Sequence, residues 1–118
     1  MKHILVTEDE YIISSSIKYH CELLGYKVTI DCTKDEDIIE AVRTGQYGLI
    51  LMKVYRSNNL DGIELMEKIR TFSSIPVIYL TGETQSSLQK RIEKTYPADF
   101  LSKPFDYSEL GEVIQRYI

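Results

Sequence analysis

Chemically reactive side chains follow several short apolar runs of this sequence, at the points where buried strands should end. Glu8 and Asp9 follow the first run, Lys53 and Thr81 follow later runs, and Lys103 follows the last. Adjacent carboxylates suit a hard divalent cation, which prefers oxygen ligands, whereas an ammonium group beside them would repel that cation. Taken singly, each residue could merely cap a helix or a turn. Together they predict one site, because ligands of open α/β sheets bind beyond the carboxyl ends of the strands.

The apolar pattern changes between strand and helix spacing about five times along the chain. This alternation predicts an α/β fold with a parallel sheet that is covered by helices on both faces. The weakest helix pattern is that of residues 85–96, whose apolar side would consist of Leu88, Ile92 and Tyr96. The strands are expected at residues 4–6, 27–31, 49–52, 76–80 and 99–102. The other helices are expected to begin near residue 10 and at capping boxes formed by Thr33 with Glu36, Asp61 with Glu64 and Asp106 with Glu109.

The composition narrows the class of protein. A chain of 118 residues fits one domain, here residues 1–118, and 43% hydrophobic with 27% charged residues is ordinary for a globular protein. The net charge of −4, without any lysine or arginine block, argues against direct nucleic-acid binding. No apolar run approaches the roughly 18 residues of a membrane span or the about 7–15 residues of a signal-peptide core. We therefore expect a cytoplasmic protein without membrane contact.

The two cysteines have neither metal-ligand nor Cys-x-x-Cys spacing. Cys21 falls on the apolar side of the first expected helix, which favours a small buried core residue, and Cys32 ends the second expected strand. Without a secretory signal, the reduced state is the better interpretation. A disulfide between the two cysteines stays open as the alternative.

The sequence carries six strings that match one known family at corresponding elements, namely residues 4–10, 25–28, 47–52, 61–65, 75–81 and 100–105. Through these strings, essentially the whole chain resembles the receiver domain of bacterial-type response regulators in two-component phosphorelay signalling. The resemblance implies a single flavodoxin-like, doubly wound (βα)5 domain whose five parallel strands have the order 2-1-3-4-5.

The resemblance also assigns roles at the predicted site. In receivers, an acidic pair and an acceptor aspartate bind Mg²⁺, and a sensor histidine kinase donates a phosphoryl group to that aspartate. Glu8 and Asp9 would be the acidic pair, and Thr81 and Lys103 would contact the phosphoryl oxygens.

The departures from the family gather around the acceptor position. Lys53 stands where receivers have the aspartate, Gly48 replaces a frequent acid, and the spacing from Lys53 to Gly62 is one residue longer than usual. We predict a degenerate pseudo-receiver, which is no enzyme and needs no cofactor. Unit charges about 4 Å apart interact by about 4 kcal/mol at an effective dielectric of 20, so the ammonium should abolish Mg²⁺ binding. We expect this ammonium to pair with Asp9 or Glu8.

The expected partners are proteins, either a sensor histidine kinase or an output domain or effector. In the family, one face often carries dimerisation or effector contacts, and it would consist here of residues 85–96, residues 99–102 and the last helix. A homodimer through this face is therefore one expectation.

Further positions are implied on or near this face. Phe100 matches an aromatic switch residue, and the lysine–proline bond before Pro104 is expected to be cis, which X–Pro bonds adopt at small cost. Tyr96, Tyr107 and Tyr117 could form an aromatic patch with Phe100, because aromatic residues are enriched at interface cores. The alternative is that these tyrosines simply half-cover a small core.

Several rival interpretations remain. The chain could be a conventional phosphoaccepting receiver with an engineered Asp-to-Lys change, although the altered loop after Lys53 favours natural divergence. Asp61 could be the acceptor in another register, but it serves better as a helix cap. A small Mg²⁺-dependent phosphohydrolase would need an Asp-x-Asp motif after the first strand, where residues 8–10 read Glu-Asp-Glu. A cofactor-binding flavodoxin-like module would need a glycine- or hydroxyl-rich phosphate loop there. A pure protein-interaction module of the same fold is the last alternative.

Overall fold

The five parallel strands of the sheet follow the predicted order. The computed structural model of the protein describes residues 2–31, 34–56, 60–82 and 86–118. The strands lie in the order β2-β1-β3-β6-β7, which is 2-1-3-4-5 when the parallel strands are counted along the chain. The α/β fold class is therefore confirmed. The strands are β1 (His3–Val6), β2 (Lys27–Ile30), β3 (Leu49–Lys53), β6 (Val77–Thr81) and β7 (Asp99–Ser102).

The central strands are apolar runs because both of their faces are covered. Every residue of β1 and β6 is buried, as are the first four residues of β3. Alternate side chains enter two separate cores, so that Ile50 packs toward one face of the sheet and Leu51 toward the other. The register aligns Ile4 with Leu49 and Ile50 with Val77, which brings the carboxyl ends of these strands to one edge.

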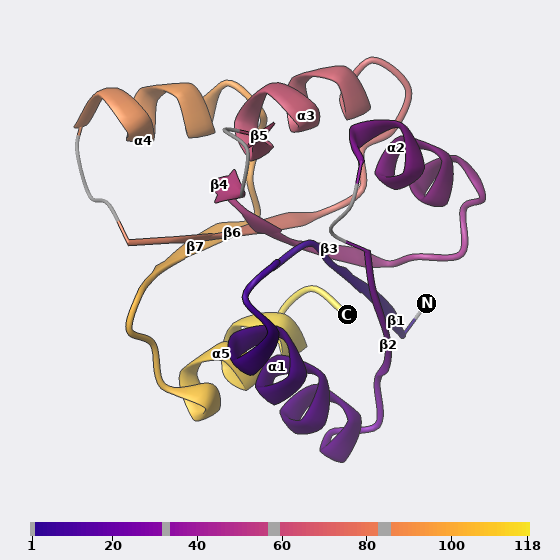
Figure 1. Cartoon of the computed structure of the whole chain (residues 1–118), viewed down its shortest axis with the longest axis vertical. Coiled ribbons are helices and arrows are strands. Elements are labelled where there is room, and N and C mark those ends of the chain that lie inside the picture. Colours follow the sequence, from indigo (N-terminus) through magenta and orange to yellow (C-terminus); the bar gives the residue numbers. More distant parts are fainter. Residues whose placement is uncertain (1, 32–33, 57–59, 83–85) are drawn as a thin grey trace.

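Two layers of helices enclose the sheet (Figure 1). Helices α1 (Tyr11–Leu23) and α5 (Tyr107–Gln115) cover one face. Helices α2 (Asp35–Arg43), α3 (Gly62–Ile69) and α4 (Ser86–Glu93) cover the other. The described helices include none with the length and apolar content needed to cross a membrane.

The α1–α5 layer is closely packed. Cys21 is buried in its core, as predicted, while Cys32 lies outside the described residues. Gly111 lets the two helices approach each other, because a Cβ atom there would lie 3.0 Å from Cδ1 of Leu24. Glycine within a helix costs about 1 kcal/mol relative to alanine, so close packing is the physical reason to keep it here.

Two of the three expected helix caps are present. Asp61 Oδ1 accepts hydrogen bonds from the backbone nitrogens of Ile63 (2.8 Å) and Glu64 (3.1 Å) at the start of α3. Asp106 Oδ1 accepts one from the backbone nitrogen of Ser108 at the start of α5 (2.9 Å). Helix α2 begins one residue later than expected, with Lys34 at the N-cap, and Thr33 lies outside the described residues.

Two sequence predictions were wrong in detail. The sequence indicates a polar loop at residues 56–59, but Arg56 belongs to the short strand β4 (Tyr55–Arg56), which pairs antiparallel with β5 (Leu60–Asp61). Residues 57–59 lie outside the described part of the chain. Tyr96 was placed on the apolar side of a helix, but α4 ends at Glu93 and the Tyr96 side chain is 81% exposed. Its φ of 53° is left-handed, so the chain turns away from the helix there. Leu88 and Ile92 are buried as predicted.

Candidate functional site

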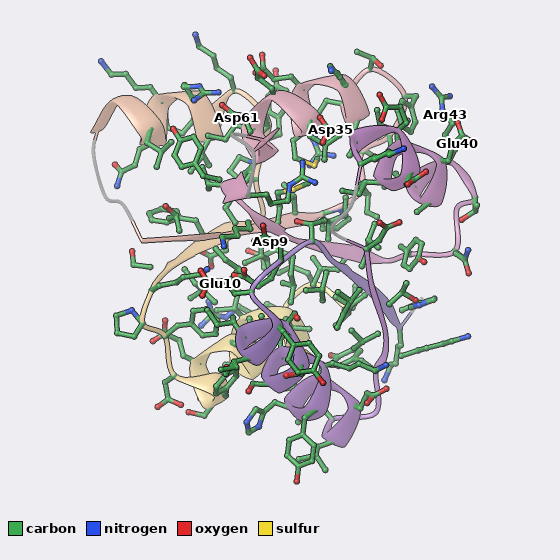
Figure 2. The ribbon with its side chains drawn as sticks, in the orientation of Figure 1. Asp9, Glu10, Asp35, Glu40, Arg43 and Asp61 are labelled. Atoms are coloured by element: carbon green, nitrogen blue, oxygen red, sulfur yellow. The ribbon has the colours of Figure 1, made fainter. Side chains whose placement is uncertain are left out.

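The predicted site residues meet at the carboxyl ends of the strands. Glu8 and Asp9 follow β1, Lys53 ends β3, Thr81 ends β6, and Lys103 follows β7. Lys53, Thr81 and Lys103 line a cavity of about 260 Å³ at this edge. Figure 2 shows Asp9 beside the end of the sheet, in the segment that leads from β1 into α1.

The Lys53 ammonium is surrounded by carboxylates. Its Nζ lies 2.8 Å from Asp9 Oδ1, 3.0 Å from Glu8 Oε2 and 3.1 Å from Glu10 Oε1, and only 15% of the side chain is exposed. The expected pairing with Asp9 or Glu8 is confirmed, because Lys53 pairs with both. Desolvation lowers the pKa of Lys53, but the hydrogen bonds to Asp9, Glu8 and Glu10 together outweigh it and leave the pKa well above its ordinary value.

Glu8 is the buried centre of this network. Its side chain is fully buried and bridges the two ammonium groups, with Oε2 near Lys53 and Oε1 accepting a hydrogen bond from Lys103 Nζ. Oε2 also accepts a hydrogen bond from the backbone nitrogen of Glu10 (3.0 Å). Buried carboxylates are costly unless they are paired and hydrogen-bonded, and here both oxygens are engaged.

Thr81 and Lys103 line the same cavity. Thr81 is buried, and its backbone carbonyl accepts a hydrogen bond from the backbone nitrogen of Lys103 (2.7 Å). The bond between Lys103 and Pro104 is cis, as predicted. Phe100, on β7, is half-buried and packs against the core that α2, α3 and α4 cover.

The backbone after β3 approaches the site closely. The pair β4–β5 turns the chain back so that the backbone nitrogen of Gly62 donates to the carbonyl of Val54 at 2.6 Å. A Cβ atom at Gly62 would overlap the carbonyl oxygen of Lys53, so glycine is required at this position. The antiparallel pair β4–β5 thus lies within the segment between Lys53 and Gly62, whose spacing is longer than usual.

The structure adds residues that the sequence did not single out. Glu10 is a third partner of Lys53, and the adjacent run of three acids in the sequence was a signal for it. The Thr7 hydroxyl is buried and accepts a hydrogen bond from the Lys53 backbone nitrogen (3.2 Å), which fixes β3 against β1. Arg56 is buried and pairs with Asp35 at 2.5 Å, which connects β4 to the start of α2.

The three tyrosines considered for an aromatic patch have different surroundings. Tyr107 lies on the α1 side, where its ring stacks on His20 with centroids 4.3 Å apart. Tyr117, near the other end of α5, donates a hydrogen bond from its hydroxyl to the carbonyl of Ala98 (2.7 Å). Tyr96 follows α4 and is exposed. Tyr107 thus faces α1 and packs partly buried against the core beneath α1 and α5, which agrees with the alternative that it half-covers the core.

The chain is similar in sequence to several bacterial transcriptional regulatory proteins. The transcriptional regulatory protein CrdR of Helicobacter pylori is 30% identical over 118 residues, which cover 98% of this chain and 54% of that protein. The uncharacterized transcriptional regulatory protein YkoG of Bacillus subtilis is 34% identical over 111 residues, which cover 92% and 47%. The chain thus spans about half the length of these curated relatives.

Solved structures show the same fold. The chemotaxis protein CheY4 of Vibrio cholerae superposes with a TM-score of 0.88 at 20% identity, covering 100% of this chain and 99% of that one. The receiver domain of a sensor histidine kinase from Pseudomonas aeruginosa, solved with a magnesium ion coordinated in its active-site cleft, gives a TM-score of 0.84 at 27% identity, covering 98% and 96%. The family model of the response regulator receiver domain matches residues 4–115. The chain therefore belongs to the response regulator receiver domains, the signalling modules of two-component systems.

Proposed function

We propose that this domain is a pseudo-receiver, in which Lys53 occupies the phosphoacceptor position and signalling proceeds by protein contacts without phosphoryl transfer. The observation that carries the proposal is the position of the Lys53 ammonium, at the end of the central strand β3 and within 3.1 Å of three carboxylates. The Lys53 ammonium would fill the place that a cation and an acceptor share in other receivers.

The chemistry of Lys53 supports the absence of a nucleophile. A protonated amine has no free electron pair with which to attack phosphorus. The carboxylates raise the pKa of Lys53 above its ordinary value, so the ammonium form persists through the physiological pH range. Phosphorylation at this position would need a carboxylate or a neutral amine, and we propose that the site supplies neither.

The donor set also does not suit Mg²⁺. Both oxygens of Glu8 already face an ammonium group, and Asp9 Oδ1 lies 2.8 Å from Lys53 Nζ. A divalent cation would have to displace Lys53 and then lie beside its charge, which costs about 4 kcal/mol at about 4 Å and an effective dielectric of 20. Among the described residues, no group of three or more His, Cys, Asp or Glu side chains could hold a metal ion.

The partners would be those of the family. Receiver domains contact histidine kinases and output domains, and several relatives of this chain are transcriptional regulatory proteins. We propose that this domain contacts such a partner in the cytoplasm in one fixed state, because its site cannot be switched by phosphorylation. An enzymatic activity and direct contact with nucleic acid are not part of the proposal.

Phosphoryl uptake tests this function directly. The purified domain is incubated with acetyl phosphate or phosphoramidate and Mg²⁺, and its intact mass is measured. We expect no added phosphoryl group, while a conventional receiver treated in parallel gains one. A stoichiometric, acid-labile phosphoryl group on this domain would overturn the proposal, and peptide mapping of that group would show whether another acid, such as Asp61, accepts it.

A further inference from the structure

The segment that leads from β5 into α3 lies against the end of the strand that carries Lys53. Figure 1 shows β4 and β5 between the sheet and the helices α3 and α4. The backbone nitrogen of Gly62 donates to the carbonyl of Val54, and a Cβ atom on Gly62 would overlap the carbonyl oxygen of Lys53. Because the two backbones are in such close contact, a shift of the chain at Lys53 would also shift Gly62 and its neighbour Asp61.

Asp61 uses its two carboxylate oxygens for two different helices. Oδ1 accepts hydrogen bonds from the backbone nitrogens of Ile63 and Glu64 at the start of α3. Oδ2 accepts a hydrogen bond from Nη2 of Arg91 at 2.7 Å, and Arg91 belongs to the last turn of α4. Figure 2 shows Asp61 beside the start of α3. One side chain thus connects the segment at the strand end with both helices.

The ion pair between Asp61 and Arg91 is partly shielded from water. The Asp61 side chain is 17% exposed and the Arg91 side chain is 39% exposed. Hydrogen bonds between charged groups are stronger than neutral ones, and salt screens them less when they are partly buried. Leu88 and Ile92 of α4 are buried in the core that α2, α3 and α4 cover. Apolar packing is not directional, so the ion pair supplies a directional contact between α4 and β5.

Lys53 and Arg91 have different ion-pair partners. The Lys53 ammonium pairs with the three carboxylates of residues 8–10, whereas Arg91 pairs with Asp61. Substitutions at sites that share no partner normally have additive effects on stability. A non-additive effect of substitutions at Lys53 and Arg91 would therefore report a coupling that the intervening segment carries.

We propose that the Asp61–Arg91 ion pair couples the strand-end site to α4, so that the position of the chain at Lys53 sets the position of the last turn of α4. The inference deepens the proposed function and rests on it, because it gives a site that is fixed by Lys53 a connection to the α3–α4 layer. With Lys53 held by carboxylates, the end of β3, the Asp61 segment and α4 stay in one arrangement. Arg91 is a positioning residue in this arrangement and takes no part in the charge network around Lys53.

A double-mutant cycle tests the coupling. Lys53→Gln removes the charge at the strand-end site, Arg91→Met removes the ion pair, and a third variant carries both substitutions. Amide hydrogen exchange followed by NMR measures the last turn of α4, with the last turn of α5 as the reference for global stability. We expect Lys53→Gln to speed exchange in α4 relative to α5 by at least about twofold when Arg91 is present. In the Arg91→Met background it should cause no further change.

The same coupling should be visible from the other side. Equilibrium coupling is reciprocal, so Arg91→Met should shift the amide resonances of Lys53 and Val54. Lys90→Met is the matched control, because Lys90 is exposed on the same turn of α4, and it should leave these resonances unchanged. Asp61→Ser separates the ion pair from the helix cap, because serine caps helices well but is too short to reach Arg91. It should therefore have the same effects as Arg91→Met.

Three results would overturn the inference: exchange in α4 that does not respond to Lys53→Gln, an equal response with and without Arg91, or Lys53 and Val54 resonances that Arg91→Met leaves in place. If Lys53→Gln does not fold, the resonances in Arg91→Met and Asp61→Ser decide alone. The mass measurement is independent of these tests. Phosphoryl uptake with an intact coupling would defeat the proposed function and leave the Asp61–Arg91 connection standing, and additive substitutions without phosphoryl uptake would do the reverse.

Discussion

The two helical layers are held against the sheet in different ways. On the α3–α4 side, Arg70 Nε donates to the Thr95 carbonyl at 2.6 Å, and the hydroxyls of Tyr79 and Thr95 lie 2.6 Å apart. Arg91 pairs with the cap residue Asp61 at 2.7 Å. Directional polar contacts therefore fix the C-terminal end of α4 and the residues that follow it. Such contacts lose most of their energy when their geometry changes.

On the α1–α5 side, the contacts between the helices are apolar and aromatic. Leu24 packs against Gly111 and His20 stacks on Tyr107, while Leu23 stays largely exposed. Apolar contacts are not directional, so they depend less on exact geometry than hydrogen bonds do. The comparison indicates that the α3–α4 layer is held by directional polar contacts and the α1–α5 layer by apolar and aromatic packing.

Lys53→Asp should cause the largest loss in the free energy of unfolding, because it disrupts the ion-pair network at the end of the sheet. It would place a fourth carboxylate beside Glu8, Asp9 and Glu10 and remove the ammonium that neutralises them. Breaking a buried ion pair costs roughly 3–5 kcal/mol, and we expect a loss at the lower end of that range without Mg²⁺. Urea unfolding with and without Mg²⁺ measures it, and Mg²⁺ should restore part of the stability.

The control for this change is Lys68→Asp, at an exposed position on α3. Its unfolding free energy should shift by no more than about 0.5 kcal/mol and should not respond to Mg²⁺. Equal losses in the two variants would show that the Lys53 network contributes nothing special to stability.

Alkaline titration should loosen the two layers in different pH ranges. Burial, with a smaller effect of Glu22, raises the pKa of Cys21 from 9.0 to about 11. Burial also raises the pKa of Tyr79 from 10.0 to about 12. In both cases the folded state favours the neutral form of the side chain. The stability that each group contributes is therefore fully present below its pKa in the unfolded chain. This contribution is lost as the pH rises to the pKa of the group in the folded protein.

The α1–α5 layer should therefore weaken between pH 9 and about 11, and the α3–α4 layer between pH 10 and about 12. At about 1.4 kcal/mol per pKa unit, each group accounts for at most about 2–3 kcal/mol. Urea unfolding against pH measures this. Cys21→Ala should abolish the loss of stability between pH 9 and about 11, and Tyr79→Phe should abolish the loss between pH 10 and about 12. A pH profile that neither variant changes would contradict the assignment.

Arg70→Ala tests the polar side of the comparison. The guanidinium donates to the carbonyls of Thr95 (2.6 Å), Ser73 (3.2 Å) and Tyr96 (3.4 Å), and its loss removes all three of these hydrogen bonds. We expect a loss of about 2 kcal/mol in urea unfolding, with faster hydrogen exchange in α4. Arg116→Ala is the matched control, because the Arg116 side chain is 62% exposed. Its loss should change the free energy of unfolding by less than about 0.5 kcal/mol. Unchanged exchange in α4 would show that Arg70 does not hold the helix.

Tyr96→Gly should change the stability least of these variants, and it should stabilise the protein rather than destabilise it. Tyr96 holds a φ of 53° with 81% of its side chain exposed, so glycine would relieve backbone strain at little cost in packing. We expect stabilisation of up to about 1 kcal/mol, read from thermal unfolding. Destabilisation would mean that the Tyr96 ring makes contacts that matter more than its backbone.

The sequence was a good guide wherever one physical rule decided the structure. Long apolar runs such as 49–52 have a single stable position in a covered parallel sheet, and Asp61 and Asp106 cap helices through purely local hydrogen bonds. The pairing of Lys53 with Glu8 and Asp9 followed from charge at adjacent strand ends.

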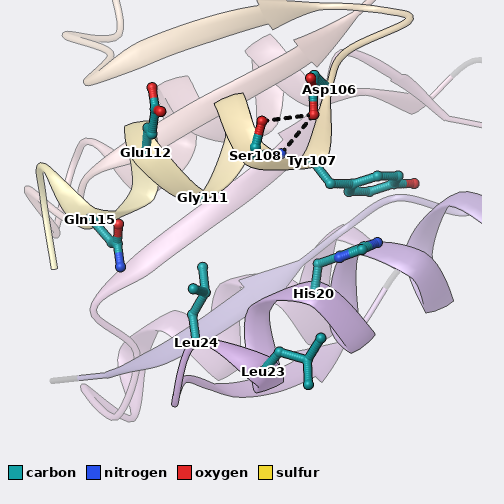
Figure 3. A pocket seen from close by; sticks show the side chains of 9 residues that line it. All are labelled: His20, Leu23, Leu24, Asp106, Tyr107, Ser108, Gly111, Glu112 and Gln115. Carbon is teal, nitrogen blue, oxygen red and sulfur yellow. Dashed lines mark hydrogen bonds between the residues drawn. The ribbon is translucent and has the colours of Figure 1, made fainter.

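Features that depend on distant contacts were harder to foresee. The pair β4–β5 is too short to produce an alternating pattern, and its position depends on the contact of Gly62 with β3. The direction of the Tyr107 side chain depends on its stacking against His20, which is far away in the sequence. The pocket between α1 and α5 (Figure 3) was not predicted either, because residues of both helices line it and it forms only when the two helices pack together.

The position of Lys53 has a consequence for how the domain responds to its surroundings. A bound ion exchanges with the solvent, so its occupancy follows the ionic composition of the cell. An ammonium carried by β3 cannot diffuse away, and its effective concentration beside Asp9 is set by the chain itself. Chelators and shifts in magnesium supply should therefore leave the charge balance at this edge of the sheet unaltered.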